Sequence, residues 1–139
     1  MKVLNKTTSA VSTLYTGSVH LYGLAVDTAG NVFFGKSITV TSSSLLVWNA
    51  TTKSTSTFLS GFQNINDMSF DTLGNLFIAD TFANTISVWN ATTSSLSVFL
   101  SGLNSVADVA FDTAGNLYYC ERRNFNSPPG NVVVKKYYV

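Results

Sequence analysis

Two aspartates, Asp67 and Asp108, stand at the same place in two copies of an internal repeat. Each begins a short apolar run of the kind that forms a strand, so both side chains would lie at equivalent strand starts. Carboxylate oxygens are the ligands that hard cations such as Ca²⁺ prefer, and the pair predicts a metal site with Asp67 and Asp108 as ligands. The alternative is that each carboxylate accepts hydrogen bonds from nearby backbone N–H groups, because the first copy has Gly23 there.

The remaining reactive side chains do not form a catalytic set. His20 is the only histidine, so the chain has no second histidine for a metal triad or an acid–base pair. A Ser-His-Asp relay would have to use His20, and no Gly-x-Ser-x-Gly phrase is present. Cys120 is the only cysteine, which excludes an internal disulfide and a zinc site built on cysteines. These residues favour a protein that is not an enzyme.

Three Asn-x-Thr sequons, at Asn5, Asn49 and Asn90, predict N-linked glycans if the protein is made in a secretory pathway. Asn and Thr are also turn residues, so the sequons have a second interpretation as turn chemistry copied by duplication. The Ser/Thr-rich, lysine-poor composition favours an extracellular location. The start of the chain carries no signal-peptide core, so export would require a signal outside this sequence.

Composition limits the class of partner. The 139 residues are 45% hydrophobic, which is ample for the core of one domain. Only 11% are charged and the net charge is +1, so we expect no nucleic-acid partner. No apolar run approaches the roughly 20 residues that a membrane-spanning helix needs, and we expect no membrane span.

The elements that must position these side chains come from a phrase that occurs three times, at 24–34, 66–80 and 108–119. Each copy has the pattern of a strand, a tight turn and a second strand. Asp27, Asp71 and Asp112 begin the turns, where a carboxylate can accept bonds from backbone N–H groups and a following Gly supplies a positive φ. Their spacing of about 40 to 45 residues is typical of propeller blades.

The middle copy predicts four short strands. Their apolar runs are two-sided, which indicates a sheet packed between neighbouring sheets. We therefore predict an all-β fold, with one domain over 1–139 made of repeats at about 1–60, 61–101 and 102–139. The four strands are Asp67 to Asp71, Asn75 to Asp80, Asn84 to Trp89 and Ser95 to Leu100.

The repeat resembles the NHL-repeat β-propellers and, more loosely, the gluconolactonase/regucalcin-like propellers. The resemblance rests on hydrophobic-Asp-x-x-Gly-Asn-hydrophobic-aromatic, followed by Ala79-Asp80 and by the Asn-x-Ile-x-Val strand at Asn84–Val88. It implies four-stranded blades, on a fold that hosts lyases, lactonases, protein-binding and RNA-binding surfaces. Only Gly23 keeps the Pro-x-Gly entry of the family, and the arginine that often follows the third-strand Asn is absent.

The phase of the repeats predicts self-association. The segment Val11 to Thr16 matches an outermost strand, and 132–139 matches a third strand that lacks a fourth. The chain would be half of a six-bladed propeller, and a second copy would complete it as a two-fold ring or continue it as a filament. The loop after Cys120 joins paired arginines to an aromatic residue, which is interface-like composition. The predicted assembly interface comprises Val11, Leu14, Tyr15, Arg122, Arg123, Phe125, Val132 and Val134.

The sequence thus favours a non-enzymatic structural or interaction module, extracellular, that assembles head to tail by strand exchange. Two alternatives stay open at this point. One is a propeller enzyme of the lactonase or lyase type with a channel metal held by Asp67 and Asp108. The other is a carbohydrate- or peptide-binding propeller, suggested by the tyrosine and tryptophan content. The ligand of either alternative is not specified by the residues.

Overall fold

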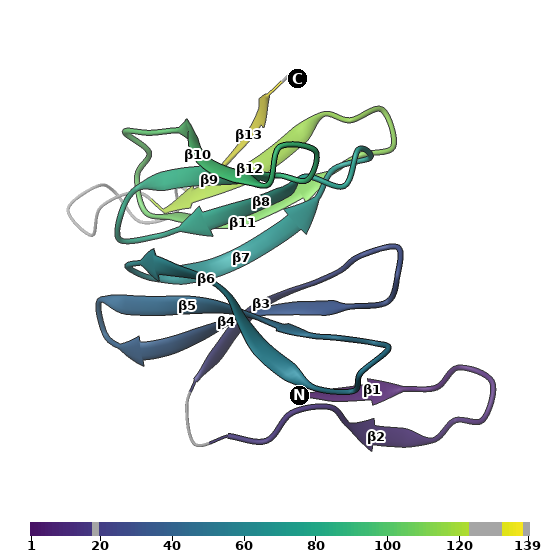
Figure 1. Ribbon diagram of the computed structural model, residues 1–139. Helices are drawn as coiled ribbons and strands as arrows, with labels where there is room; N and C mark the ends of the chain where they lie inside the picture. The colour runs from purple at the N-terminus through teal and green to yellow at the C-terminus, as the bar shows by residue number, and fades with distance from the viewer. Residues whose placement is uncertain (18–19, 123–131, 138–139) are drawn as a thin grey trace.

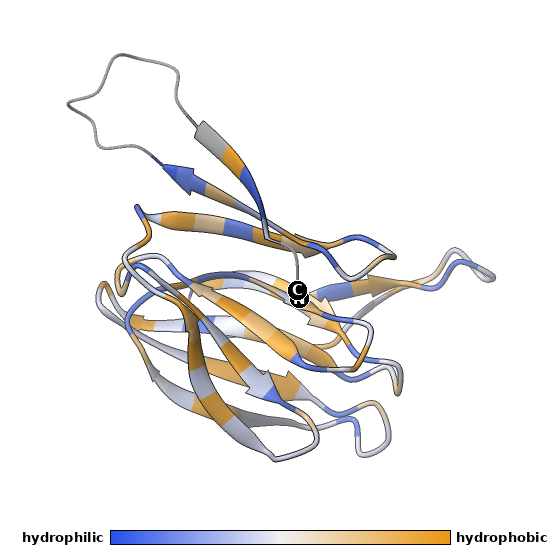
Figure 2. Cartoon of the chain, turned by 90° about the horizontal axis from the view of Figure 1, so that it is seen from above, coloured by the Kyte–Doolittle hydropathy of each residue, from blue (hydrophilic) through white to orange (hydrophobic). Residues whose placement is uncertain are grey.

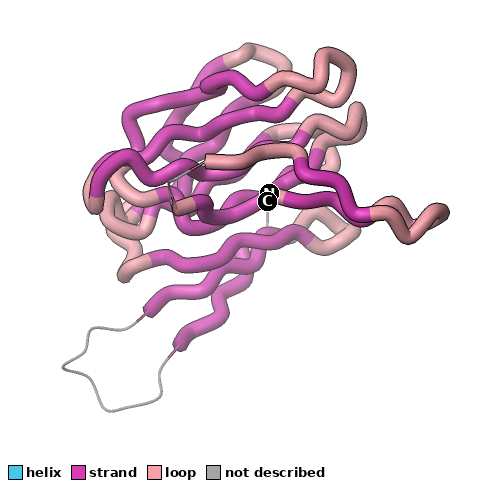
Figure 3. Tube along the Cα trace, turned by 90° about the horizontal axis from the view of Figure 1, so that it is seen from below, coloured by secondary structure: helices cyan, strands magenta, loops and turns pink. Residues whose placement is uncertain are grey.

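The computed structural model describes residues 1–17, 20–122 and 132–137, and all regular structure in these ranges is β-strand (Figure 3). The prediction of an all-β fold is confirmed. The described residues contain no helix that is long and apolar enough to cross a membrane. The strands are Lys2–Leu4 (β1), Val11–Thr13 (β2), Leu21–Val26 (β3), Val32–Thr39 (β4), Ser42–Trp48 (β5), Thr55–Phe62 (β6), Ile65–Phe70 (β7), Leu76–Asp80 (β8), Thr85–Asn90 (β9), Ser95–Leu100 (β10), Val106–Phe111 (β11), Leu117–Arg122 (β12) and Val132–Tyr137 (β13).

Within each sheet the strands form an antiparallel meander, because each strand pairs with the next one along the chain. Strands β3 to β6 form a first sheet, β7 to β10 a second, and β11 to β13 a third, while β1 and β2 form an N-terminal hairpin. In Figure 1 the hairpin, first, second and third sheets follow one another through the molecule. The first strands of the sheets are neighbours, with β7 in contact with both β3 and β11. This arrangement is a series of propeller blades with their first strands innermost.

Equivalent tight turns join the first two strands of each sheet. Asp71 Oδ1 accepts the backbone N–H groups of Leu73 and Asn75 at 2.9 and 2.8 Å, and Oδ2 accepts the Asn75 side-chain amide at 2.8 Å. Gly74 closes the turn with φ +84°, a conformation that favours glycine. Asp27 and Asp112 make the same three bonds in their own turns. The three copies of the phrase therefore fold alike.

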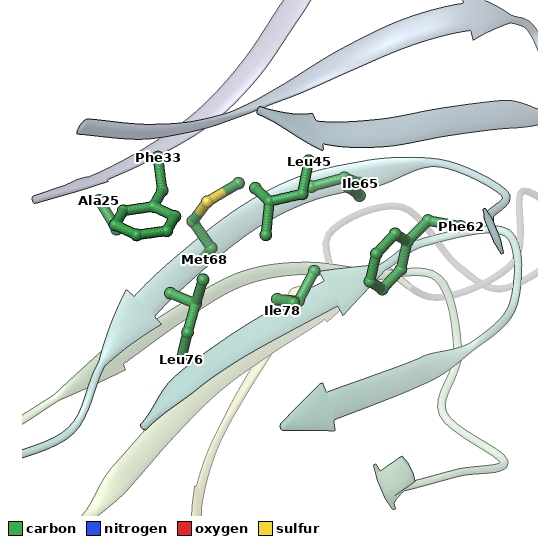
Figure 4. Close-up of a cluster of buried hydrophobic side chains, with 8 residues drawn as sticks. All are labelled: Ala25, Phe33, Leu45, Phe62, Ile65, Met68, Leu76 and Ile78. Carbon is green, nitrogen blue, oxygen red and sulfur yellow. The ribbon is translucent and has the colours of Figure 1, made fainter. Parts of the chain in front are cut away.

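Two hydrophobic cores lie between adjacent sheets. Successive side chains of β8 point to opposite faces of the second sheet, so β8 contributes to both cores. Leu76 and Ile78 face the first sheet, whereas Phe77 and Ala79 face the third, and all four are at most 3% exposed. Figure 4 shows the first core, where Phe33 and Leu45 of the first sheet meet side chains of the second. Figure 2 shows hydrophobic residues running along the stacked strands. Each fully buried side chain of this size contributes about 1.5–3 kcal/mol.

The N-terminal hairpin covers only part of the first sheet. The Met1 amino group donates to the Tyr15 carbonyl at 2.7 Å, and the Tyr15 ring lies 5.2 Å from that of Phe34. Phe34 is 1% exposed as a result. β2 ends at Thr13, so it is shorter than the outer strand that the sequence predicted to reach Thr16.

Candidate functional site

The outer face of the third sheet repeats a surface that is buried in the other two sheets. Val134 pairs with Cys120 in the register in which Leu45 pairs with Gly35 and Ile86 with Ala79. Leu45 and Ile86 are 0% exposed because each packs against the next sheet, whereas Val134 is 66% exposed. We call this surface, formed by Ala110, Tyr118, Cys120 and Val134, the leading face. The described residues place no further sheet on it.

The first sheet has the complementary opening. Leu24 occupies the place of Met68 in the second sheet and Val109 in the third, each of which packs against the preceding sheet. Met68 and Val109 are 2% and 4% exposed, whereas Leu24 is 52% exposed. We call the surface around Leu24 and Tyr22 the trailing face. A hollow of about 490 Å³ lies here between the hairpin and the first sheet, lined by Met1, Lys2, Leu21, Tyr22, Gly23, Leu24 and Phe34.

Two basic residues modify the leading face. Lys136 pairs with Tyr118, where the other sheets have Val47 and Val88, and its ammonium group lies 5.3 Å from the Tyr118 ring centroid. The aliphatic stem of Lys136 can cover part of that ring. Arg122 is exposed at the end of β12. Glu121, also on β12, forms an ion pair with Lys135, with 2.9 Å between Oε2 and Nζ.

The other predicted assembly residues are dispersed or lie beyond what is described. Val11 is 61% exposed on β2, while Leu14 and Tyr15 are half-buried after it. Val132 begins β13 opposite Arg122. Arg123 and Phe125 lie outside the described residues. The structure thus brings Val134 to the leading face, and it places Val11, Leu14 and Tyr15 on or beside the hairpin next to the trailing face.

Asp67 takes part in a sheet-to-sheet contact. Its Oδ2 accepts the Val109 N–H of the neighbouring inner strand at 3.0 Å. Burial raises the pKa of this carboxyl, the N–H groups of Val109 and Met68 lower it, and the nearby Asp108 raises it again. Asp108 is exposed, and the described residues contain no cluster of three or more His, Cys, Asp or Glu that could hold a metal. The calcium site stays a prediction, to be tested by titrating CaCl₂ into the protein and its Asp67→Asn variant.

Gly23 takes the place of Asp67 and Asp108 in the first copy, for a steric reason that the sequence did not reveal. A Cβ on Gly23 would lie 2.8 Å from the Asp67 Cα, so only glycine lets β3 approach β7 this closely. Two further side chains tie the second sheet to the third. Asn66 Nδ2 donates to the Ala107 carbonyl and Thr81 Oγ1 to the Val106 carbonyl, both at 2.7 Å.

The three sequon asparagines occupy equivalent turns between third and fourth strands. In each, Oδ1 accepts the N–H groups two and three residues ahead, at 2.9 to 3.0 Å. Asn5 is exposed, and Asn49 and Asn90 are half-buried. The turn bonds use Oδ1 and not Nδ2, the atom that would carry a glycan. Turn chemistry therefore accounts for these residues, and their glycosylation stays a prediction.

Comparison with known proteins identifies the architecture. The sequence matches no protein-family model and no curated protein. A crystal structure of a nidogen/laminin complex is similar over 97% of this chain and 52% of its own, with 19% identity and a TM-score of 0.74. A gluconolactonase from Xanthomonas campestris is similar over 89% of this chain and 45% of its own, with 17% identity and a TM-score of 0.68.

A luciferin-regenerating enzyme gives 15% identity over 81% of this chain and 44% of its own, with a TM-score of 0.67. The chain thus spans about half the length of the solved structures it matches. Identities this low establish the fold and leave activity open. The sheets, their order and these neighbours together show that the chain has the β-propeller fold, with a looser similarity to gluconolactonase propellers.

Proposed function

We propose that the protein is a non-enzymatic structural module that assembles with copies of itself head to tail. The observation that carries the proposal is the contrast between Val134, which is 66% exposed, and its buried equivalents Leu45 and Ile86. Exposed apolar sheet faces are typical of surfaces that bind another protein. An extracellular location and occupied sequons belong to the same proposal, which is compatible with turn bonds that use Oδ1 of each asparagine and not Nδ2.

A second copy is the occupant that fits both faces. Twice within the chain, a surface equivalent to the leading face packs on a surface equivalent to the trailing face, and these contacts form the two cores. The leading face of one copy would therefore meet the trailing face of another through the packing the chain already uses. Such a contact is heterologous, so it closes into a ring or continues as a filament.

Strand exchange would follow from the same docking. β13 is an edge strand of the third sheet, and β2 has the position of a fourth strand. β1 and β13 both occupy third-strand positions, because Asn5 forms the turn that Asn49 forms after β5, and Tyr137 pairs with Leu117 as Trp48 pairs with Val32. Where two copies meet, the third-strand position can hold either β1 of one copy or β13 of the other. We propose that β2 of one copy pairs with β13 of the copy whose leading face it meets, and that β1 leaves the third-strand position.

The test uses one variant for each face. Val134→Glu places a charge on the leading face, and Leu24→Glu places one on the trailing face. Sedimentation velocity should show that the wild-type protein has at least twice the 15.0 kDa of one chain and that each variant is monomeric. Leu73→Glu is the control, because Leu73 is 81% exposed in a turn away from both faces.

Mixing the two variants gives the sharper result. Each variant keeps one intact face, so an equimolar mixture should form a complex of two chains and grow no further. A wild-type protein that is monomeric at high concentration would refute the assembly. A mixture that stays monomeric would refute the head-to-tail contact.

A further inference from the structure

A pocket of about 370 Å³ lies between the first and second sheets, beside the turns that begin at Asp27 and Asp71. Aromatic rings form much of its lining, from Phe33, Phe58, Phe70 and Trp89. Figure 4 shows Phe33 and Leu76 together at one end of the first core, and both also line this pocket. Its volume is within the range of small-ligand sites.

The rings form one connected group. Phe33 lies edge-on to Phe58 at 5.1 Å and to Phe70 at 5.3 Å, and Phe58 lies 5.1 Å from Trp89. Such contacts fix the rings before any ligand arrives. A rigid aromatic site loses little side-chain entropy on binding.

Among the residues that the structure describes, the two aspartates are the only ionisable side chains that line the pocket. Their carboxylates are held in place by the turn bonds, with Asp27 Oδ1 accepting the N–H groups of Ala29 and Asn31. Neither Lys nor Arg lines the pocket within the described part of the chain. Negative charge at the rim and π-electron density inside both attract a cation.

The tryptophan at the equivalent position of the first sheet already has a cation over its ring. Trp48 is the first-sheet equivalent of Trp89, and the Lys53 ammonium group lies 5.1 Å from its ring centroid. Ser94 occupies the place of Lys53 in the second sheet, in a turn with the same hydrogen bonds. The backbone is also the same, with φ +58° at Lys53 and +52° at Ser94. Trp89 therefore has a serine where Trp48 has a cation.

We propose that this pocket binds an organic ammonium cation against the Trp89 ring, with Asp27 and Asp71 supplying the negative charge. Alkylated ammonium groups suit the pocket because they pair a positive charge with apolar surface that the phenylalanine rings can cover. The pocket lies between sheets of one chain, so the proposal does not depend on self-assembly.

The first experiment titrates tetramethylammonium chloride into the protein and follows the indole N–H signals of Trp48 and Trp89 by NMR. A saturable shift of the Trp89 signal is expected, with little change at Trp48. Sodium chloride at equal ionic strength controls for salt, and tert-butanol controls for shape without charge. The proposal is overturned if no saturable shift occurs, or if tert-butanol shifts Trp89 as strongly as the cation does.

The second experiment uses matched variants on the exposed turn and the rim. Ser94→Lys should place an internal ammonium group at Trp89 and weaken tetramethylammonium binding at least tenfold, whereas Ser94→Gln should bind like the wild type. Asp71→Asn keeps Oδ1 for the two backbone bonds of the turn, loses the acceptor of the Asn75 amide and removes the charge. It should also weaken binding, and its thermal unfolding shows that the protein is still folded at the temperature of the titration. Unchanged affinity in both Ser94→Lys and Asp71→Asn would overturn the proposal.

Discussion

Asp67 and Asp112 are carboxylates whose surroundings shift their pKa values in opposite directions. Burial raises the pKa of Asp67 above its ordinary value of 3.8. Hydrogen bonds from the Asn116 side chain and backbone, with further bonds from Tyr118 and Ala114, lower the pKa of Asp112. A raised carboxyl pKa means that the folded state binds more protons than the unfolded chain. Stability therefore falls as pH rises from the ordinary pKa of the unfolded chain through the raised pKa of the folded state. A lowered pKa gives stability that is lost as pH falls.

We predict opposite effects for the two Asn variants. Asp67→Asn keeps an acceptor for the Val109 N–H and removes the buried charge, so its Tm at pH 7 should exceed that of the wild type. Asp112→Asn loses the acceptor of the Asn116 amide, so its Tm at pH 7 should be lower. The Asp67 difference should shrink at pH 3, where its raised pKa favours the protonated carboxyl. The Asp112 difference should shrink less there, because its lowered pKa keeps the carboxylate ionised to more acidic pH. Thermal scans at the two pH values measure this, and shifts of the same sign in both variants would contradict it.

Gly74 tests the turn that recurs in every copy. Its φ is +84°, and a β-branched residue is strained there. Gly74→Val should therefore lower the free energy of unfolding by about 1–3 kcal/mol. Leu73→Ala is the control, since Leu73 is 81% exposed beside it and should change stability by less than about 0.5 kcal/mol. Urea denaturation of both variants measures the difference, and equal midpoints would rule out the strain.

At the scale of the elements, equivalent positions in different sheets have very different surroundings. Ile86 is 0% exposed and Val134 is 66% exposed, although each pairs with the same position of its second strand. Ile86→Ala should cost about 2–5 kcal/mol through lost burial and a cavity. Val134→Ala should cost less than about 0.5 kcal/mol in a single chain. Denaturation in the Leu24→Glu background, where assembly is blocked, measures both, and similar losses would show that β13 is covered within the chain.

The sequence predicts local elements well because their causes are local. The strands expected from Asp67, Asn75, Asn84 and Ser95 begin within two residues of those observed, since turn residues and β-branched runs define them. The Asp-to-Gly turns were predicted for the same reason. Apolar runs without polar alternation also indicated sheets with two buried faces, as β8 shows.

Contacts between sheets were not predicted, because they join residues far apart in sequence. The glycine at position 23 is explained only by the approach of Asp67, and the Asn66 and Thr81 bonds reach the third sheet. The pairing of β2 with β1 was also missed, since a three-residue ladder has little sequence signal. The aromatic pocket between the first two sheets combines residues from six strands and three turns, so no single stretch of sequence indicates it.

At the scale of the whole molecule, the chain covers 52% of the chain it matches in the nidogen/laminin complex, and its leading and trailing faces are exposed at Val134 and Leu24. These faces resemble the two halves of contacts that the chain makes internally. If the C-terminus of one copy is fused to the N-terminus of another, the leading face of the first copy should pack on the trailing face of the second. The remaining pair would then meet if the arc closes on itself.

A tandem fusion of two copies therefore separates a ring from a filament. If two copies close a ring, the fused chain should be a monomer of twice the 15.0 kDa of one chain, with no concentration dependence. If the contact does not close, the fused chain should polymerise through its terminal faces, and Val134→Glu in the second copy alone should stop this. Sedimentation velocity over a wide concentration range distinguishes the two results. A monomeric fusion that unfolds in two separate transitions would contradict closure, because a continuous ring of packed sheets should unfold as one unit.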